Sequence, residues 1–213
     1  MRHALLFLVL CLIWGFTYVA LKIGLRYAPP LTFTFARALI GGLALGGYAL
    51  VTTRRFPTDA FTHGAAVALG GGFFWAVGTV LFRAWQRRLD ILWTTALQAL
   101  YGAVPLALLA FAVERPHFDV TVELGWTLAF TGLGSAGLAY LIYFYLLRHR
   151  DVAEVNSFVF LVPFFAVLFG AVILGERLGP ISLVGAALIL AGIYVVGTRA
   201  RRAPASTKGV GSS

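Results

Sequence analysis

The sequence predicts an all-α, polytopic membrane protein with about seven transmembrane helices. Of its 213 residues, 60% are hydrophobic and only 12% are charged, whereas charged residues make up about 25% of an ordinary soluble domain. The apolar residues form long uncharged runs, most of them near the length of about 18 residues that a membrane helix needs. These runs are continuously apolar, whereas the strands of a membrane barrel alternate in polarity over about 10 residues.

The charged residues separate the runs and so give the elements in chain order. The first run, 4–21, is too long for a signal-peptide core and has bulky Tyr18 where cleavage after Ala20 would need a small residue, so we expect an uncleaved span. The second run, 38–53, reaches spanning length only when it is extended back to Leu31, which places Arg37 inside it. The remaining predicted spans are 60–82, 91–113, 124–147, 155–175 and 178–198.

The net charge of +9 comes from cations clustered at the ends of the runs. Such clusters are typical of topology signals, and they form no continuous basic face, so we expect a lipid bilayer and no nucleic acid as partner. All aspartates, glutamates and histidines fall in loops or at span ends, which leaves no buried carboxylate as a proton carrier. The sequence shows no catalytic or metal-binding motif, so we expect no enzyme, no catalytic or metal-ligating residue and no cofactor.

Two topologies follow from the charges. With seven spans, most cations lie on the side opposite the N-terminus, which predicts an external N-terminus. In the alternative, one segment does not cross, and Arg2 and the Arg54–Arg55 pair lie in the cytoplasm. The run 60–82 is the candidate for this segment, because the glycines at 70–72 lower its helix propensity.

An internal repeat appears when the chain is shifted by 61 positions, so that residues 4–50 align with 65–111 without a gap. Trp14 then aligns with Trp75 and Lys22 with Arg83, while Arg37 falls on polar Gln98. Internal repeats of this kind are typical of transporters, whose binding sites lie where the repeats meet.

Arg37 is the strongest candidate for a substrate-pathway residue. A cation at the centre of a span costs about 2.5–3.5 kcal/mol on insertion scales, so it is usually turned toward a cavity or a partner. The alternative is that its long stem extends the charge to the interface. Trp14 and Trp75 lie in the middle of their runs, where they either line a cavity or pack between helices.

Three further residues are candidates for the pathway. Gln98 and Asn156 carry uncharged polar groups that bind either a substrate or a neighbouring helix. Pro163 interrupts a predicted helix and frees a backbone carbonyl, which suggests a kink that lines the pathway.

Three charged residues are interpreted as structural. Lys22 and Arg83 stand at the ends of their spans, where boundary anchoring is the simplest explanation. Glu176 lies in the turn between the last two runs, where we expect a helix-end cap paired with Arg177.

Several of these motifs are similar to those of EamA-type permeases of the drug/metabolite transporter superfamily. They are Trp14-Gly15 followed by Lys22, the second tryptophan motif at 74–79, and the Gly-Glu-Arg-Leu turn at 175–178, which is the most specific. The resemblance covers residues 4–198. It implies alternating access around a central cavity, and therefore secondary transport of a small organic metabolite.

The resemblance also implies a division of the chain. Such permeases have two inverted repeats of five helices, whereas this chain holds a partial first repeat of two helices (1–52), a polar loop (53–63), a complete second repeat (64–198) and a basic disordered tail (199–213). The helices that the partial first repeat lacks would form part of the cavity wall, and a second copy of the chain, as in a homodimer, would supply that part. We expect a multi-pass protein of a bacterial or archaeal cell membrane. The alternative function is a truncated, non-transporting membrane remnant or interaction protein.

Overall fold

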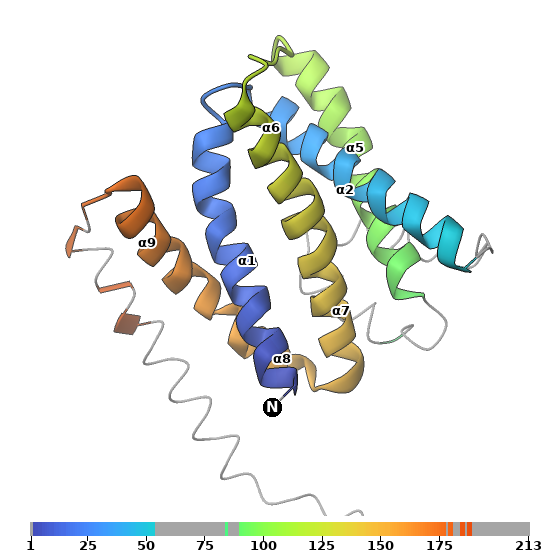
Figure 1. The fold of residues 1–213 in the computed structure, drawn as a ribbon, viewed down its shortest axis with the longest axis vertical. Helices are drawn as coiled ribbons and strands as arrows, with labels where there is room; N and C mark the ends of the chain where they lie inside the picture. The colour runs from blue at the N-terminus through green and yellow to red at the C-terminus, as the bar shows by residue number, and fades with distance from the viewer. Residues whose placement is uncertain are drawn as a thin grey trace, which may run out of the picture.

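The computed structural model describes residues 2–53, 84, 90–177, 179–180, 184–185 and 187–188. Every regular element in these residues is helical (Figure 1), so the predicted all-α membrane fold is confirmed. The run 60–82 and most of 178–198 lie outside the described residues, and the count of seven spans stays a prediction. Five segments of the described part are long and apolar enough to cross a membrane: His3–Gly24, Pro30–Thr52, Ile91–Val113, Val122–His149 and Val152–Leu174.

The first three spans are single helices, α1 (Arg2–Gly24), α2 (Pro30–Thr53) and α5 (Ile91–Val113). Helix α2 begins with a proline, which has no N–H to leave unpaired at the first helical position. Helix α5 begins after Asp90, whose carboxylate accepts a hydrogen bond of 3.0 Å from the backbone N–H of Trp93. Asp90, the charged residue before the apolar run 91–113, therefore also caps the start of α5.

The next two spans are not regular α-helices. The fourth consists of α6 (Val122–Ala129), the π-helix η1 (Phe130–Ala139) and α7 (Tyr140–His149). The fifth is divided at Phe160 into α8 (Val152–Val159) and α9 (Leu161–Leu174). Pro163 lies in the first turn of α9, so the predicted interruption is present three residues before the proline itself.

Helix α1 is central to the described part, where it packs against α6, η1, α7, α8 and α9 (Figure 1). A core cluster joins Phe7 and Leu10 of α1 to Tyr143 and Leu146 of α7. On the side facing α9, a Cβ atom on Gly15 would lie 2.5 Å from the Cβ of Phe165. Only glycine fits at this position without moving the two helices apart.

Helices α2 and α5 run antiparallel. Gly42 of α2 lies against Leu100, Gly46 lies against Ala96, and Ala49 packs in one cluster with Trp93. Residue numbers thus rise along α2 as they fall along α5. The last turn of α2 and the first turn of α5 therefore lie at the same end of the bundle.

This end also holds the start of α1 and the end of α7. The His3 ring stacks on Tyr145 at a centroid distance of 6.3 Å, and Arg150 Nη2 lies 3.4 Å from His3 Nδ1. Leu6, Ile91 and Tyr145 line one apolar cavity there. We call this end the N-terminal face, and we call the end defined by Lys22, Glu114 and Gly175 the distal face.

The described helices place the start of α1, the end of α2 and the start of α5 on the N-terminal face. The two topologies that the charges allow differ in the segment between α2 and α5. This segment lies outside the described residues, so both topologies stay predictions.

Glu114 holds the distal ends of α5 and α2 together. Its carboxylate accepts hydrogen bonds of 2.9 Å each from the backbone N–H groups of Leu31 and Thr32 and from the Thr32 hydroxyl. The carboxylate thereby satisfies N–H groups that the first turn of α2 leaves unpaired. Desolvation raises the pKa of Glu114, but these hydrogen bonds outweigh it and hold the pKa below its ordinary value.

We expect Glu114→Gln to destabilise the protein by a pH-dependent amount. Because the folded-state pKa is lowered, the charged carboxylate stabilises the fold fully above pH 4.5, its ordinary pKa, and loses this effect as the pH falls through the lowered value. Thermal unfolding in detergent between pH 8 and pH 3 should therefore show a gap between wild type and variant that closes in acid. Glu123→Gln, at the start of α6, is the control, and an equal, pH-independent gap for both variants would contradict this role.

Cysteine labelling should place Thr52 and Asp151 on one face and Val120 on the other. The native Cys11 is fully buried and its thiol donates to the Phe158 carbonyl at 3.2 Å, so wild type should remain unlabelled. In intact cells, a membrane-impermeant maleimide should either label both Thr52→Cys and Asp151→Cys or label neither. Val120→Cys should show the opposite result. Matching behaviour of Thr52→Cys and Val120→Cys would overturn the shared face of α2 and α5.

Candidate functional site

Trp14 connects α1 to η1 and α7 in the interior of the bundle. Its indole N–H donates to the backbone carbonyl of Ser135 at 3.3 Å. Its ring meets Tyr140 edge-on at a centroid distance of 5.3 Å and lies 5.6 Å from Tyr143. The hydrogen bond to Ser135 and the aromatic contacts with Tyr140 and Tyr143 therefore hold Trp14 of α1 against η1 and α7.

The π-helix η1 brings its backbone close to α2. A Cβ atom on Gly132 would lie 2.9 Å from Ile40 Cγ2 and 3.0 Å from the carbonyl oxygen of Arg37, and a Cβ atom on Gly41 would lie 2.6 Å from the Gly132 carbonyl oxygen. Small residues permit such close approach between membrane helices. Because π-helical turns often occur at functional sites, η1 marks this region as a candidate site.

Arg37 lies on α2 beside this junction. The residue is partly buried, and its guanidinium lies within electrostatic range of the Tyr140 side chain. In the described part of the chain, no hydrogen bond or ion pair to the Arg37 guanidinium is found. A guanidinium is always protonated, so Arg37 brings a permanent positive charge, without a carboxylate counter-ion among the described residues, beside the aromatic residues of α7.

Asn156 of α8 is joined to the same group. The Tyr143 hydroxyl donates to Asn156 Oδ1 at 3.1 Å, and the Tyr143 side chain is only 1% exposed. The inter-helix hydrogen bond that the sequence left as one of two alternatives is therefore present. Tyr143 contacts Trp14, and Tyr140 contacts Trp14 and interacts with Arg37, so these two tyrosines link three predicted site residues.

Tyr140 and Tyr143 were not among the predicted site residues. Their spacing of three places both on one side of α7, the side that faces α1. The aromatic run 140–145 was the available signal, but aromatic residues in an apolar span are equally compatible with lipid contact.

The other predicted pathway residues lie outside this group. Gln98 is on α5, where its Oε1 atom is buried without a hydrogen-bond partner among the described residues. Pro163 is exposed on the surface of α9. Trp75 and Arg83 fall outside the described residues.

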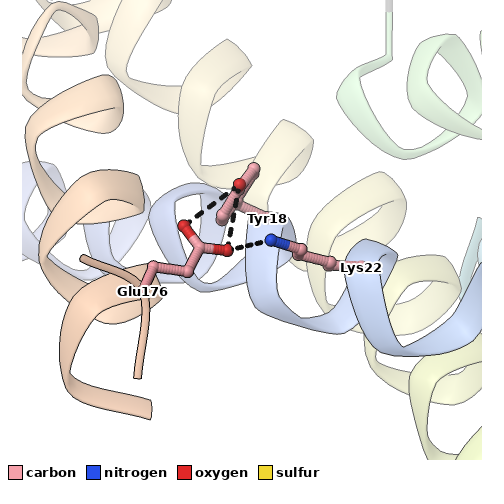
Figure 2. A network of polar contacts seen from close by, with 3 residues as sticks. All are labelled: Tyr18, Lys22 and Glu176. Carbon is pink, nitrogen blue, oxygen red and sulfur yellow. Dashed lines mark hydrogen bonds and ion pairs between the residues drawn. The ribbon is translucent and has the colours of Figure 1, made fainter. Parts of the chain in front are cut away.

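A second set of polar contacts joins α1 to the residues after α9 at the distal face (Figure 2). Glu176 forms an ion pair with Lys22, and its two carboxylate oxygens lie 3.3 and 3.4 Å from the Tyr18 hydroxyl. We call Tyr18, Lys22 and Glu176 the distal network. The expected pairing of Glu176 with Arg177 was wrong, because the turn directs Glu176 toward α1.

Two glycines make the distal network possible. Gly175 has a φ of 66°, a left-handed conformation that ends α9 and reverses the chain. The Glu176 N–H then donates to the Gly170 carbonyl at 3.2 Å. A Cβ atom on Gly170 would lie 2.9 Å from Glu176 Oε2 and 3.2 Å from Tyr18 Cε1, so the missing side chain leaves room for both groups.

A charge exchange should distinguish the observed pairing from the pairing expected in the turn. Glu176→Lys places two cations together and should lower the melting temperature in detergent by about 2–4 °C, the scale of a modest change in electrostatic energy. Adding Lys22→Glu should restore part of the loss. Arg177→Ala should have little effect, and a loss for Arg177→Ala equal to that for Lys22→Ala would contradict the distal network.

Comparison with known proteins connects these features to a family. Residues 1–62 and 62–198 match the EamA-like transporter family. The chain is 30% identical to the uncharacterized transporter YvbV of Bacillus subtilis, over 79% of this chain and 56% of that protein. It is also 30% identical to the chloroplastic WAT1-related protein At3g02690 of Arabidopsis thaliana, over 73% of this chain and 40% of that protein.

Two further similarities concern an exporter and a fold. The chain is 28% identical to a probable terminal-alkyne amino-acid exporter of Streptantibioticus cattleyicolor, over 83% of this chain and 60% of that protein. A solved crystal structure matches 93% of this chain and 89% of its own with a TM-score of 0.51 and 18% identity, which shows a similar fold alone. This chain spans about half the length of the curated relatives it matches. The family match covers nearly the whole chain, which confirms the resemblance: this integral membrane protein belongs to the EamA-like transporter family.

Proposed function

We propose that the chain acts as a secondary transporter of a small organic metabolite by alternating access. The observation that carries this proposal is the interior group of Trp14, Arg37, Tyr140 and Asn156, to which both family-matched segments contribute. A permanent charge and several polar groups in the interior of a membrane bundle are typical of a substrate pathway. Family membership, with relatives named as transporters, supports the same function.

The distal network closes one side of the pathway in this conformation. It joins the end of α1 to the end of α9, while the break at Phe160 lets α9 move relative to α8. Hinges of this kind occupy a few residues at the ends of helices. Opening toward the distal face requires the contacts of Glu176 with Lys22 and Tyr18 to break.

The N-terminal face lies in the cytoplasm. In sequence, Arg54 and Arg55 directly follow α2, Arg87 and Arg88 come shortly before α5, and α7 ends at a basic segment. Positive charges near short loops favour the cytoplasmic side. The distal network would then close the pathway toward the outside of a bacterial or archaeal cell.

A second copy of the chain completes the pathway wall. The relatives are about twice as long as the part that this chain matches. Helices α8 and α9 are largely uncovered in the described part, with Val172 74% exposed and Phe160 63% exposed. Apolar surfaces of this kind are suited to contact with lipid or with a second copy of the chain, and a homodimer in which the second copy covers them is the proposed transporting form.

Flux measurements in proteoliposomes test the proposed function. The full chain should move at least one compound from a panel of radiolabelled amino acids and monocarboxylic acids above the rate of protein-free vesicles. The panel includes a terminal-alkyne amino acid because of the exporter relative. Arg37→Ala should lower this flux strongly, and Arg26→Ala, in the exposed turn after α1, should not. Flux equal to that of empty vesicles for the whole panel would favour the non-transporting alternative.

A further inference from the structure

We propose that the substrate is an organic monoanion with an apolar body, and that Arg37 binds its charged group. This inference rests on the proposed transport function and names its substrate class. It depends on the charge balance around Arg37, on the position of Arg37 beside η1, and on the chemistry of its surroundings.

The charge balance favours an anion. The described carboxylates all lie away from the middle of the spans. Five occupy the ends of helices (Asp90, Glu114, Glu123, Asp151 and Glu154), Asp119 lies in the loop before α6, and Lys22 and Tyr18 engage Glu176 at the distal face. In the ranges that the structure describes, Arg37 thus has no carboxylate partner. Charged residues within membrane spans normally pair with other groups, and an anionic ligand would supply such a partner for Arg37 when it enters the site.

The position of Arg37 opposes a purely interfacial role. Arg37 lies seven residues after the start of α2, which corresponds to about 10 Å along the helix axis. Its carbonyl oxygen would lie 3.0 Å from a Cβ atom on Gly132 of η1, its guanidinium lies within electrostatic range of Tyr140, and no described ion pair joins it to an acidic group at the distal face. The charge is therefore available within the bundle.

The groups around Arg37 indicate the charge and the polarity of the ligand. A single guanidinium matches one carboxylate through two parallel hydrogen bonds, so a monoanion balances the site and a dianion leaves an excess charge. The neighbouring side chains are Ile40 of α2, Tyr140 of α7 and, against Tyr140, Trp14 of α1. These groups favour an aliphatic or aromatic body over a sugar or a nucleotide.

The test measures binding without transport. Phenylacetate and isovalerate are added to the detergent-solubilised full chain, with phenylacetamide, isovaleramide and phenethylamine as neutral and cationic counterparts. Saturation-transfer NMR should show binding of at least one acid and none of the counterparts. Arg37→Gln should weaken acid binding about 10- to 100-fold, the effect of removing a hydrogen bond to a charged group, and Arg37→Lys should retain part of it.

The controls separate this inference from the proposed function. Arg26→Gln should bind the acid as wild type does, and size-exclusion chromatography shows that each variant is folded. Unchanged acid binding in Arg37→Gln, equal binding of phenethylamine, or no binding of either acid would overturn the anion site. Acid binding that depends on Arg37 without flux would leave the anion site standing and contradict transport. Transport of a neutral or cationic compound at a rate that Arg37→Gln does not change would support transport and contradict the anion site.

Discussion

The packing of α1 against α9 is the contact on which the rest of the described structure depends. Lipid tails are as apolar as leucine side chains, so membrane helices associate through close packing and hydrogen bonds rather than through exclusion of water. At one level Gly15 accepts the Phe165 side chain, and at the distal end Gly170 leaves space for Tyr18 and Glu176. With α1 held in this way, its other sides meet η1 and α7.

The interior polar group follows from this arrangement. Irregular backbone in a membrane is tolerated where protein surrounds it, and η1 lies between α1 and α2. Its Ser135 carbonyl binds Trp14, and its glycines admit the backbone of α2 with Arg37. In the described part of the chain, Arg37 is thus held beside η1, while the acidic residues lie at helix ends and in loops. The proposed anion would supply a partner for this charge when it enters the site.

The sequence predicted the helices well because a membrane span needs uninterrupted apolar residues, and the charges that end each run also cap helices, as Asp90 does for α5. It did not predict η1, since a segment of glycine and apolar residues is compatible with both α- and π-helical turns. The partner of Glu176 was also missed. The nearest cation in sequence is Arg177, but the left-handed Gly175 directs the carboxylate to Lys22, 154 residues away.

Within the candidate site, Trp14, Arg37 and Asn156 were predicted because polar or mid-span aromatic residues stand out in an apolar run. Tyr140 and Tyr143 were missed because their role depends on tertiary contacts.

Helix α1 and the end of α9 form one wall of a single bundle. A crosslink between Lys22→Cys and Glu176→Cys in the full chain tests this arrangement, with a short bismaleimide added to membranes while native Cys11 stays buried. After cleavage at a protease site introduced into the polar segment 53–63, the two fragments should remain covalently joined in the double variant and separate in each single variant. Complete separation in the double variant would contradict the account.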